Sequence, residues 1–187
     1  MPHSETFIDG VWYPSVSTII GVQPKPWLNA WRERWGERAT RKMEIANAIG
    51  TAFHDAIEQY LDKGVFCISM NTYSSCVPRV GKMMTSWLNW ANNVDGTVEH
   101  TELKVISRTH TYSGTLDAVG RMGKTPMLID WKTSSRIYDD MQLQLAAYVR
   151  MLRGTARRLR MSGARAEQQN NRRGSIWRKP LCNYSDA

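Results

Sequence analysis

Apolar residues recur at helical spacing in three stretches of the first half of the chain, over residues 27–35, 38–62 and 80–92. Apolar positions three and four residues apart predict a helix with one buried face, so each stretch is expected to pack against a core. The tryptophans of the first of these helices are expected to lie in that core, and the alternative is a platform for stacking bases. Residues 7–22 mix β-branched and aromatic residues with Gly and Pro and are expected to be extended.

From residue 97 onward the apolar period falls from about 3.6 to two. This alternation predicts three strands, over residues 97–107, 112–121 and 126–132, which Gly-containing or polar turns join into a meander. A last helix is expected to begin near Asp139 or Asp140 and to run into the C-terminal segment. Along the sequence, the pattern therefore predicts helices before and after a three-stranded meander.

Length and composition are those of one domain with a basic extension. The chain has 187 residues, of which 42% are hydrophobic, enough for a core without disulfides. Its net charge of +8 is concentrated in residues 151–187, which carry nine Lys or Arg and two Asp or Glu. We therefore predict a domain over residues 1–153 and a basic tail over residues 154–187, in which GSIWR resembles a short strand. The tail is either a contact for nucleic acid or a solvated extension.

Cysteine content and hydropathy argue against several classes of protein. Cys67, Cys76 and Cys182 form no Cys-x-x-Cys pair, which argues against a disulfide framework and against a four-cysteine zinc or iron–sulfur site. No apolar run approaches the roughly 18 residues that a membrane helix needs. The N-terminus, MPHSETFIDG, also lacks the basic start and apolar run of a signal peptide. The protein is therefore expected to be soluble and not exported.

The segment LIDWKTSS places Asp130 and Lys132 two residues apart on a predicted strand. Side chains at this spacing leave the same face of a strand, about 6.6 Å apart. A carboxylate that holds a hard cation and a nearby ammonium suit the hydrolysis of a phosphodiester. The alternative for this motif alone is a surface strand with an ion pair at its edge.

Asp117 lies between apolar residues on the preceding strand, so its carboxylate needs a partner. If the two strands form a hairpin around residues 122–125, Asp117 lies close to Asp130. Two adjacent carboxylates are tolerated mainly when a cation joins them. The alternative is a single buried Asp that accepts hydrogen bonds from backbone amides.

Two helices carry further polar residues at a spacing of four. Gly50, His54 and Glu58 share one stripe of the long helix, where His54 is a candidate metal ligand or phosphate contact and Glu58 is its orienting partner or an acid outside the ligand set. Gln144 and Tyr148 share one stripe of the last helix and can reach a phosphate or a lysine. The alternatives are a solvated His/Glu pair and an ordinary amphipathic helix.

Taken in order, GTAFHDAIE, GTLDAVG, LIDWKTS and QLAAY resemble the motifs of the RecB-like exonuclease branch of the PD-(D/E)XK nuclease superfamily. The segment PSVSTII and the tryptophan-rich helix after it add a similarity to phage nucleases of this branch and to the mitochondrial genome maintenance exonuclease. The resemblance covers about residues 14–150. It implies a restriction-endonuclease-like α/β core, in which helices flank a central mixed β-sheet that contains the antiparallel meander.

The resemblance also implies roles for individual residues. A divalent cation, Mg²⁺ or Mn²⁺, is expected at His54, Asp117, Asp130 and the carbonyl of Trp131. Lys132 matches the catalytic lysine, Gln144 and Tyr148 match the motif on the following helix, and Glu58 and Glu102 are acidic residues expected beside the ligands. Glu102 is alternatively a strand residue that faces solvent. The basic tail is expected to contact DNA through Arg157, Arg158, Arg160, Arg172 and Arg173. No iron–sulfur cluster is expected, because members that hold one use four cysteines.

The resemblance therefore implies a metal-dependent exonuclease that hydrolyses DNA from its ends, in recombination, repair or phage DNA processing. DNA is the expected partner, with recombination or replication proteins as further candidates and no membrane contact. The expected location is the cytoplasm of a bacterial or phage-infected cell. The sequence leaves two alternatives open, a structure-selective endonuclease and a DNA-binding or assembly subunit without turnover.

Overall fold

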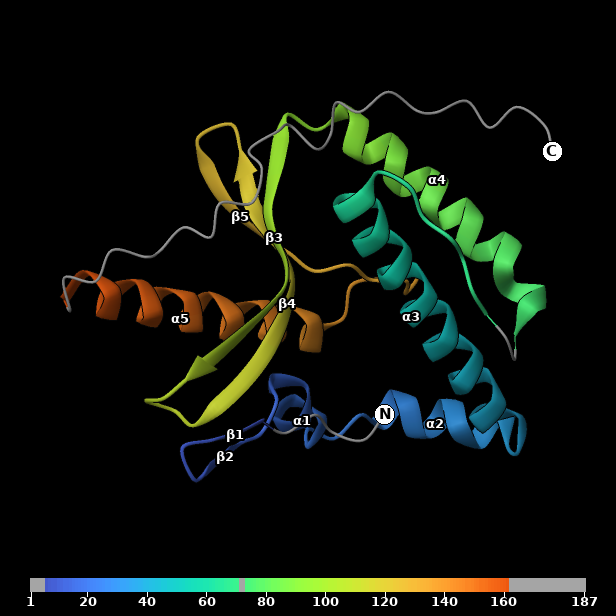
Figure 1. Cartoon of the computed structure of the whole chain (residues 1–187). Helices are drawn as coiled ribbons and strands as arrows, with labels where there is room; N and C mark the ends of the chain where they lie inside the picture. The colour runs from blue at the N-terminus through green and yellow to red at the C-terminus, as the bar shows by residue number, and fades with distance from the viewer. Residues whose placement is uncertain (1–5, 71–72, 162–187) are drawn as a thin grey trace.

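The computed structural model describes residues 6–70 and 73–161 (Figure 1). Within these residues the chain forms a helix-flanked sheet, as the period of the sequence predicts. The elements in chain order are β1 (Thr6–Ile8), β2 (Val11–Tyr13), α1 (Val16–Gly21), α2 (Pro26–Trp35), α3 (Arg38–Lys63), a 3₁₀ turn η1 (Ser74–Cys76), α4 (Val77–Asn93), β3 (Gly96–Ser107), β4 (Tyr112–Met122), β5 (Thr125–Ile129) and α5 (Asp139–Met161).

The predicted meander is confirmed, since β3, β4 and β5 pair in that order and each pair is antiparallel. The described sheet is antiparallel, and the mixed sheet that the resemblance implies stays a prediction. Among the described residues the one parallel pairing is an isolated bridge between Ser15 and Ser113. The segment GSIWR, residues 174–178, lies outside the described residues. The finding is therefore an α/β protein whose described sheet is antiparallel.

The sequence predicts an extended N-terminal segment. In the structure this segment forms the β1–β2 hairpin followed by the short helix α1. Asp9 and Gly10, both with positive φ, form the two-residue turn between β1 and β2. Such Asp-Gly turns match the twist of a hairpin. Ser15 then begins α1, because its hydroxyl accepts a hydrogen bond from the backbone N–H of Thr18 at 3.1 Å.

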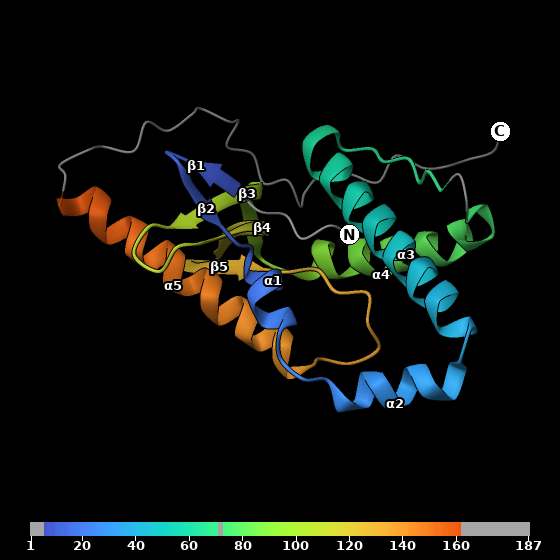
Figure 2. The same cartoon turned by 90° about the horizontal axis from the view of Figure 1, so that it is seen from below.

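Two apolar clusters hold the fold together. The larger is built from the buried faces of α3 and α4 against the sheet, with Ile49, Ile57 and Met84 almost completely buried. The smaller joins α1 and α5 to the sheet through Val16 and Leu116, among others. Helices α3 and α4 therefore stand on one side of the strands while α5 crosses the other (Figures 1 and 2).

Helix α2 differs from the prediction in its packing. It occupies the expected residues, but none of its side chains is buried. Trp27 is 51% exposed and Trp35 is 36% exposed, so the expectation that these tryptophans lie in the core is wrong. The physical reason is that α3 and α4 already fill the larger cluster, and α2 lies at the edge of the molecule beside the start of α3 (Figure 2).

Helix α5 crosses the predicted boundary between domain and tail. It continues to Met161, so the division between residues 153 and 154 falls inside a helix. Arg157, Arg158 and Arg160 belong to this helix, whereas Arg172 and Arg173 lie outside the described residues. Among the described helices, none combines the length and the apolar character needed to cross a membrane.

Candidate metal centre

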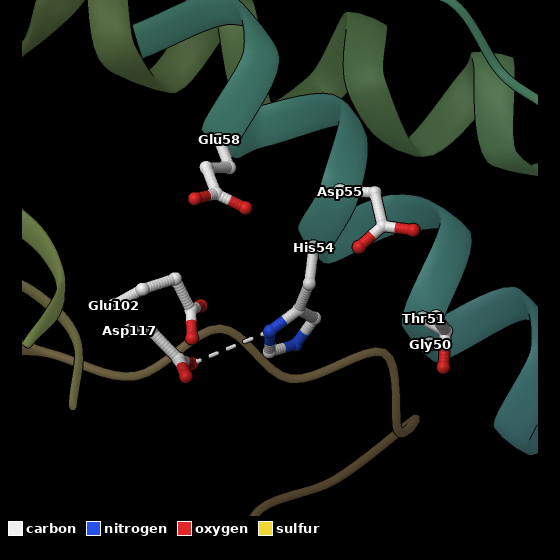
Figure 3. Close-up of a pocket in the computed structure, with 7 residues that line it drawn as sticks. All are labelled: Gly50, Thr51, His54, Asp55, Glu58, Glu102 and Asp117. Carbon is white, nitrogen blue, oxygen red and sulfur yellow. Dashed lines mark ion pairs between the residues drawn. The ribbon is translucent and has the colours of Figure 1, made fainter. Parts of the chain in front are cut away.

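Three side chains from three elements meet in one group. His54 comes from α3, Glu102 from β3 and Asp117 from β4, and one ligand atom of each lies within 4.8 Å of the others (Figure 3). An imidazole nitrogen and two carboxylate oxygens at this separation can hold a metal ion. The sequence had placed His54 and Asp117 among the ligands and Glu102 beside them.

The strand register brings the two carboxylates together. Thr101 pairs with Ala118 and Leu103 with Leu116, so Glu102 stands across from Asp117. Like charges directly opposite each other on neighbouring strands are destabilising. The backbone of Glu102 also has a φ of +47°, a conformation that costs a non-glycine residue about 1 kcal/mol or more.

His54 is oriented by a backbone carbonyl. Its Nε2 lies 2.9 Å from the oxygen of Trp131, and because a carbonyl can only accept, Nε2 carries the proton and donates it. In the neutral ring the lone pair is then on Nδ1, which lies 3.7 Å from Oδ2 of Asp117. Histidines that bind a metal through one ring nitrogen commonly donate a hydrogen bond from the N–H of the other in this way. The orienting partner of His54 is therefore Trp131, not Glu58.

The same residue fixes Asp117. The N–H of Trp131 donates to Oδ2 of Asp117 at 2.7 Å. Its buried indole packs edge-on against Trp87 and Trp90, with ring centroids 5.7 and 5.6 Å away. The backbone of Trp131 thus holds His54 through its carbonyl and Asp117 through its amide. The carbonyl, which the resemblance had implied as a metal ligand, accepts the hydrogen bond from His54.

Asp130 and Lys132 lie in a loop and not on a strand, because β5 ends at Ile129. Lys132 Nζ is 2.5 Å from Oδ2 of Asp130. The Asp130 side chain is only 4% exposed, and its Oδ1 has no hydrogen-bond partner among the described residues. Asp130 is not part of the group of three, although its charge reaches Asp117.

Two carboxylates of the group, those of Asp117 and Glu102, have raised pKa values. Burial raises the pKa of Asp117 most, and the charge of Asp130 raises it further, while His54 and the amide of Trp131 lower it. Partial desolvation raises the pKa of Glu102, and Asp117 and Glu58 add to the effect. Burial and neighbouring negative charges therefore make the ionised form of both carboxylates less favourable.

A pocket of about 400 Å³ opens over the group. Its wall on α3 runs from Glu58 past Asp55 and His54 to Thr51 and Gly50, as Figure 3 shows. Asp55 is a pocket residue that the sequence analysis missed, since it lies off the stripe that His54 defines. A Cβ added to Gly50 would meet its nearest neighbour, Thr133, at an ordinary 3.7 Å.

Gln144 and Tyr148 are not among the residues that line this pocket, but they lie near it, because the charges of Asp130, Asp117 and Glu102 add to the raised pKa of Tyr148. Tyr148 is buried in the smaller apolar cluster, and Gln144 Nε2 donates to its hydroxyl at 3.0 Å. Burial raises the pKa of Tyr148, while the hydrogen bond from Gln144 lowers it. A Cβ at Gly114 would stand 2.5 Å from the Tyr148 ring, so this glycine makes room for the tyrosine.

The donors present fit a divalent cation. Positive charge would stabilise the two facing carboxylates with raised pKa values and the unsatisfied buried oxygen of Asp130. Carboxylates suit Mg²⁺ and Mn²⁺, and the added imidazole favours a transition metal such as Mn²⁺. The described residues therefore contain a centre that can hold a metal ion.

Comparison with known proteins found no matching protein-family model and no matching curated protein. The chemistry of the metal centre and its surroundings is therefore the basis on which we assign a function.

Proposed function

We propose that the protein is a divalent-metal-dependent deoxyribonuclease with a restriction-endonuclease-like core, which hydrolyses DNA phosphodiesters from an end. The observation that carries the proposal is the convergence of His54, Glu102 and Asp117 within 4.8 Å, next to the ion pair of Asp130 and Lys132. Acidic ligands in the middle of β3 and β4, with a lysine in the loop just after β5, suit phosphoryl chemistry.

The proposed metal ligands are His54, Glu102 and Asp117, with Oδ1 of Asp130 as a further donor. A bound Mg²⁺ or Mn²⁺ would offset charge on the scissile phosphate and make an attacking water more acidic. The protein contributes orientation, because Trp131 fixes both His54 and Asp117 through its backbone. Preorganised ligands of this kind lose little entropy at the moment of reaction.

Lys132 is the proposed catalytic cation. Its ammonium is held by Oδ2 of Asp130, and its side chain keeps 28% of its surface exposed, so solvent and a substrate phosphate can reach it. A lysine there can neutralise charge on the phosphate and orient a water for in-line attack. Asp130 is proposed to position Lys132 as well as to support the cation.

Two other functions use the same residues. A structure-selective endonuclease would differ in how DNA reaches the pocket, and a DNA-binding subunit would keep the fold without turnover. The intact set of Asp117, Asp130 and Lys132 favours an enzyme over the second alternative. Linear and covalently closed circular DNA distinguish cleavage at ends from cleavage at internal positions.

The test compares linear with covalently closed circular DNA of the same sequence, in Mg²⁺ or Mn²⁺. We expect degradation of the linear DNA alone, complete loss on chelation, and a decrease of roughly a hundredfold or more in Asp117→Asn and Lys132→Ala. Glu99→Gln is the matched control, because Glu99 lies on the same strand as Glu102 but pairs with Arg121 at 2.9 Å. Cleavage of the circle would favour the endonuclease. Cleavage at full rate without metal would refute the proposal.

A further inference from the structure

Helix α2 carries a row of three tryptophans, of which Trp27 and Trp35 are exposed and Trp31 is half-buried. Trp27, Trp31 and Trp35 follow one another at a spacing of four, so they share one stripe of the helix. No residue of α2 is buried, and the indoles of Trp27 and Trp35 are 51% and 36% exposed. Large exposed aromatic surfaces are costly in water and commonly mark a binding site.

The row continues onto the loop that carries Lys132, and we call Tyr138, Trp27, Trp31 and Trp35 together the aromatic row. Trp27 stacks on Tyr138 with ring centroids 5.0 Å apart and planes only 8° from parallel. Lys25, just before α2, bonds Asp140 of α5 at 2.6 Å and ties the two helix starts together. Tyr138 ends the loop between β5 and α5, which Figure 2 shows reaching out from the sheet.

The loop also connects this row to the pocket. It starts at Asp130 and Lys132, and its Thr133 lies beside Gly50, one of the residues that line the pocket wall. The loop over residues 130–138 therefore links the pocket wall at Thr133 to the aromatic row at Tyr138.

The surroundings of the aromatic row are strongly basic. Residues 25–42 contain six Lys or Arg and two Asp or Glu. Apart from Lys25, these cations form no ion pair with a carboxylate among the described residues. Lys42 lies over the ring of Trp35, 3.8 Å from its centroid. The positive charge at this end of the molecule is therefore free to meet a polyanion.

We propose that the aromatic row and its flanking arginines bind an unpaired strand of DNA that extends from the metal centre, an inference that rests on the proposed function. Stacking on exposed rings needs free base faces, which a single strand offers along its length and a duplex only at its end. Arg32 and Arg34 supply the contacts to phosphates. The substrate class is therefore DNA with a single-stranded end, and not a blunt duplex.

A second exposed aromatic pair provides a matched control. Phe7 and Trp12 lie on the β1–β2 hairpin with ring centroids 4.7 Å apart, and Trp12 is 59% exposed. The nearby cation Arg108 is already paired with Asp9 at 3.0 Å. This pair is as exposed as Trp27 but is not connected to the loop of Lys132, so its removal tests for nonspecific stickiness.

The experiment measures the affinity of the full-length protein for a single-stranded oligonucleotide and for a blunt duplex, with Ca²⁺ in place of the catalytic metal. One stacked base is worth about 1–3 kcal/mol, so we expect Trp27→Ala to weaken single-strand binding by about tenfold or more. Trp27→Phe should retain most of it, and Trp12→Ala should bind like the parent. Arg32→Ala with Arg34→Ala should reduce the salt slope on single strands by about 1.4.

The proposal is overturned if Trp27→Ala binds single strands as the parent does, or if it weakens single-strand and duplex binding equally. It is also overturned if an acidic polypeptide competes as well as the oligonucleotide, because that shows charge without stacking. Thermal melting of each variant excludes unfolding as the cause of weaker binding. If Trp27 governs single-strand binding but the parent protein cleaves no DNA with Mg²⁺ or Mn²⁺, the binding surface stands and the proposed nuclease function fails.

Discussion

At the scale of single residues, Glu102 and Asp117 destabilise the folded protein. Two carboxylates face each other across neighbouring strands, and one of them has a left-handed backbone. Both have raised pKa values, which means that ionisation costs free energy in the folded state. Strain of this kind is typical of functional sites, where a ligand relieves it.

The first prediction concerns Glu102, which the sequence placed only beside the ligands. We expect Glu102→Gln to weaken Mn²⁺ binding by about tenfold to a hundredfold, because a neutral amide is a poorer ligand. Titration calorimetry measures the affinity, and Glu99→Gln is the control on the same strand. Unchanged Mn²⁺ affinity in Glu102→Gln would remove Glu102 from the ligand set.

The second prediction is a dependence of stability on pH. Because the pKa of Glu102 is raised in the fold, its contribution is fully present below its unfolded pKa and is lost as pH rises through the folded pKa. Without metal, the melting temperature of Glu102→Gln should therefore match the parent near pH 4 and exceed it increasingly toward pH 7. Calorimetry measures both melting temperatures. If they differ by the same amount from pH 4 to pH 7, the ionisation of Glu102 is not the cause of the difference.

At the scale of elements, an irregularity in β3 aims Glu102 at Asp117. The register shifts by one residue between Val98 and His100, where Glu99 is the extra residue. Without this bulge Glu102 would pair with Leu116, and its side chain would leave the other face of the sheet. The hairpin is also tight, since a Cβ at Gly120 would overlap the carbonyl oxygen of Thr97 on β3.

The third prediction tests this close approach. Gly120→Ala should lower the free energy of unfolding by about 1–3 kcal/mol, because the added methyl forces the two strands apart. The melting temperature should then fall by roughly 2 to 10 °C. Gly81→Ala on α4 is the control, since its nearest neighbour would lie 3.9 Å away. Equal melting temperatures for Gly120→Ala and the parent would show that the hairpin is looser than described.

The elements also show what a sequence can and cannot predict. Apolar period alone predicts α2, α3, α4 and the meander, because that period follows directly from which face is buried. It does not predict the bulge at Glu99 or the positive φ at Glu102, which depend on pairing across strands. Nor does it show that Trp27 stays outside the core, because that depends on the room left by α3 and α4.

The candidate site was predictable in part for the same reason. His54 and Asp117 stand out as polar residues in apolar surroundings, and the structure brings them within reach of each other. Asp130 and Lys132 were expected on a strand, but β5 ends one residue before Asp130. Strand ends are set by hydrogen-bond partners on the neighbouring strand, which a local pattern does not contain.

At the scale of the whole molecule, charge is distributed unevenly around an acidic centre. Carboxylates line the pocket, whereas cations gather in residues 25–42 and toward the C-terminus. The DNA substrate that we propose would be repelled by the acidic pocket and attracted by the basic segments, so the proposed cation and these segments would act together. Binding and catalysis are therefore expected to respond differently to salt and to metal.

The fourth prediction concerns the basic C-terminus, which should be truncated after Met161 so that α5 stays complete. Five Lys or Arg follow this residue. If two or three of them contact phosphates, the slope of log affinity against log salt on duplex DNA should fall by about 2 to 3. Binding in Ca²⁺ at several salt concentrations measures the slope. An unchanged slope would show that the tail is a solvated extension.

The central claim is that His54, Glu102 and Asp117 bind one divalent cation. Crystals of the protein grown with Mn²⁺ test it most directly, because anomalous scattering locates the ion without assumption about its ligands. We predict one strong peak in contact with Nδ1 of His54 and with carboxylate oxygens of Glu102 and Asp117, and its loss in Asp117→Asn. A crystal grown with Mn²⁺ that shows no peak at these three residues, or shows Mn²⁺ bound only elsewhere, would contradict it.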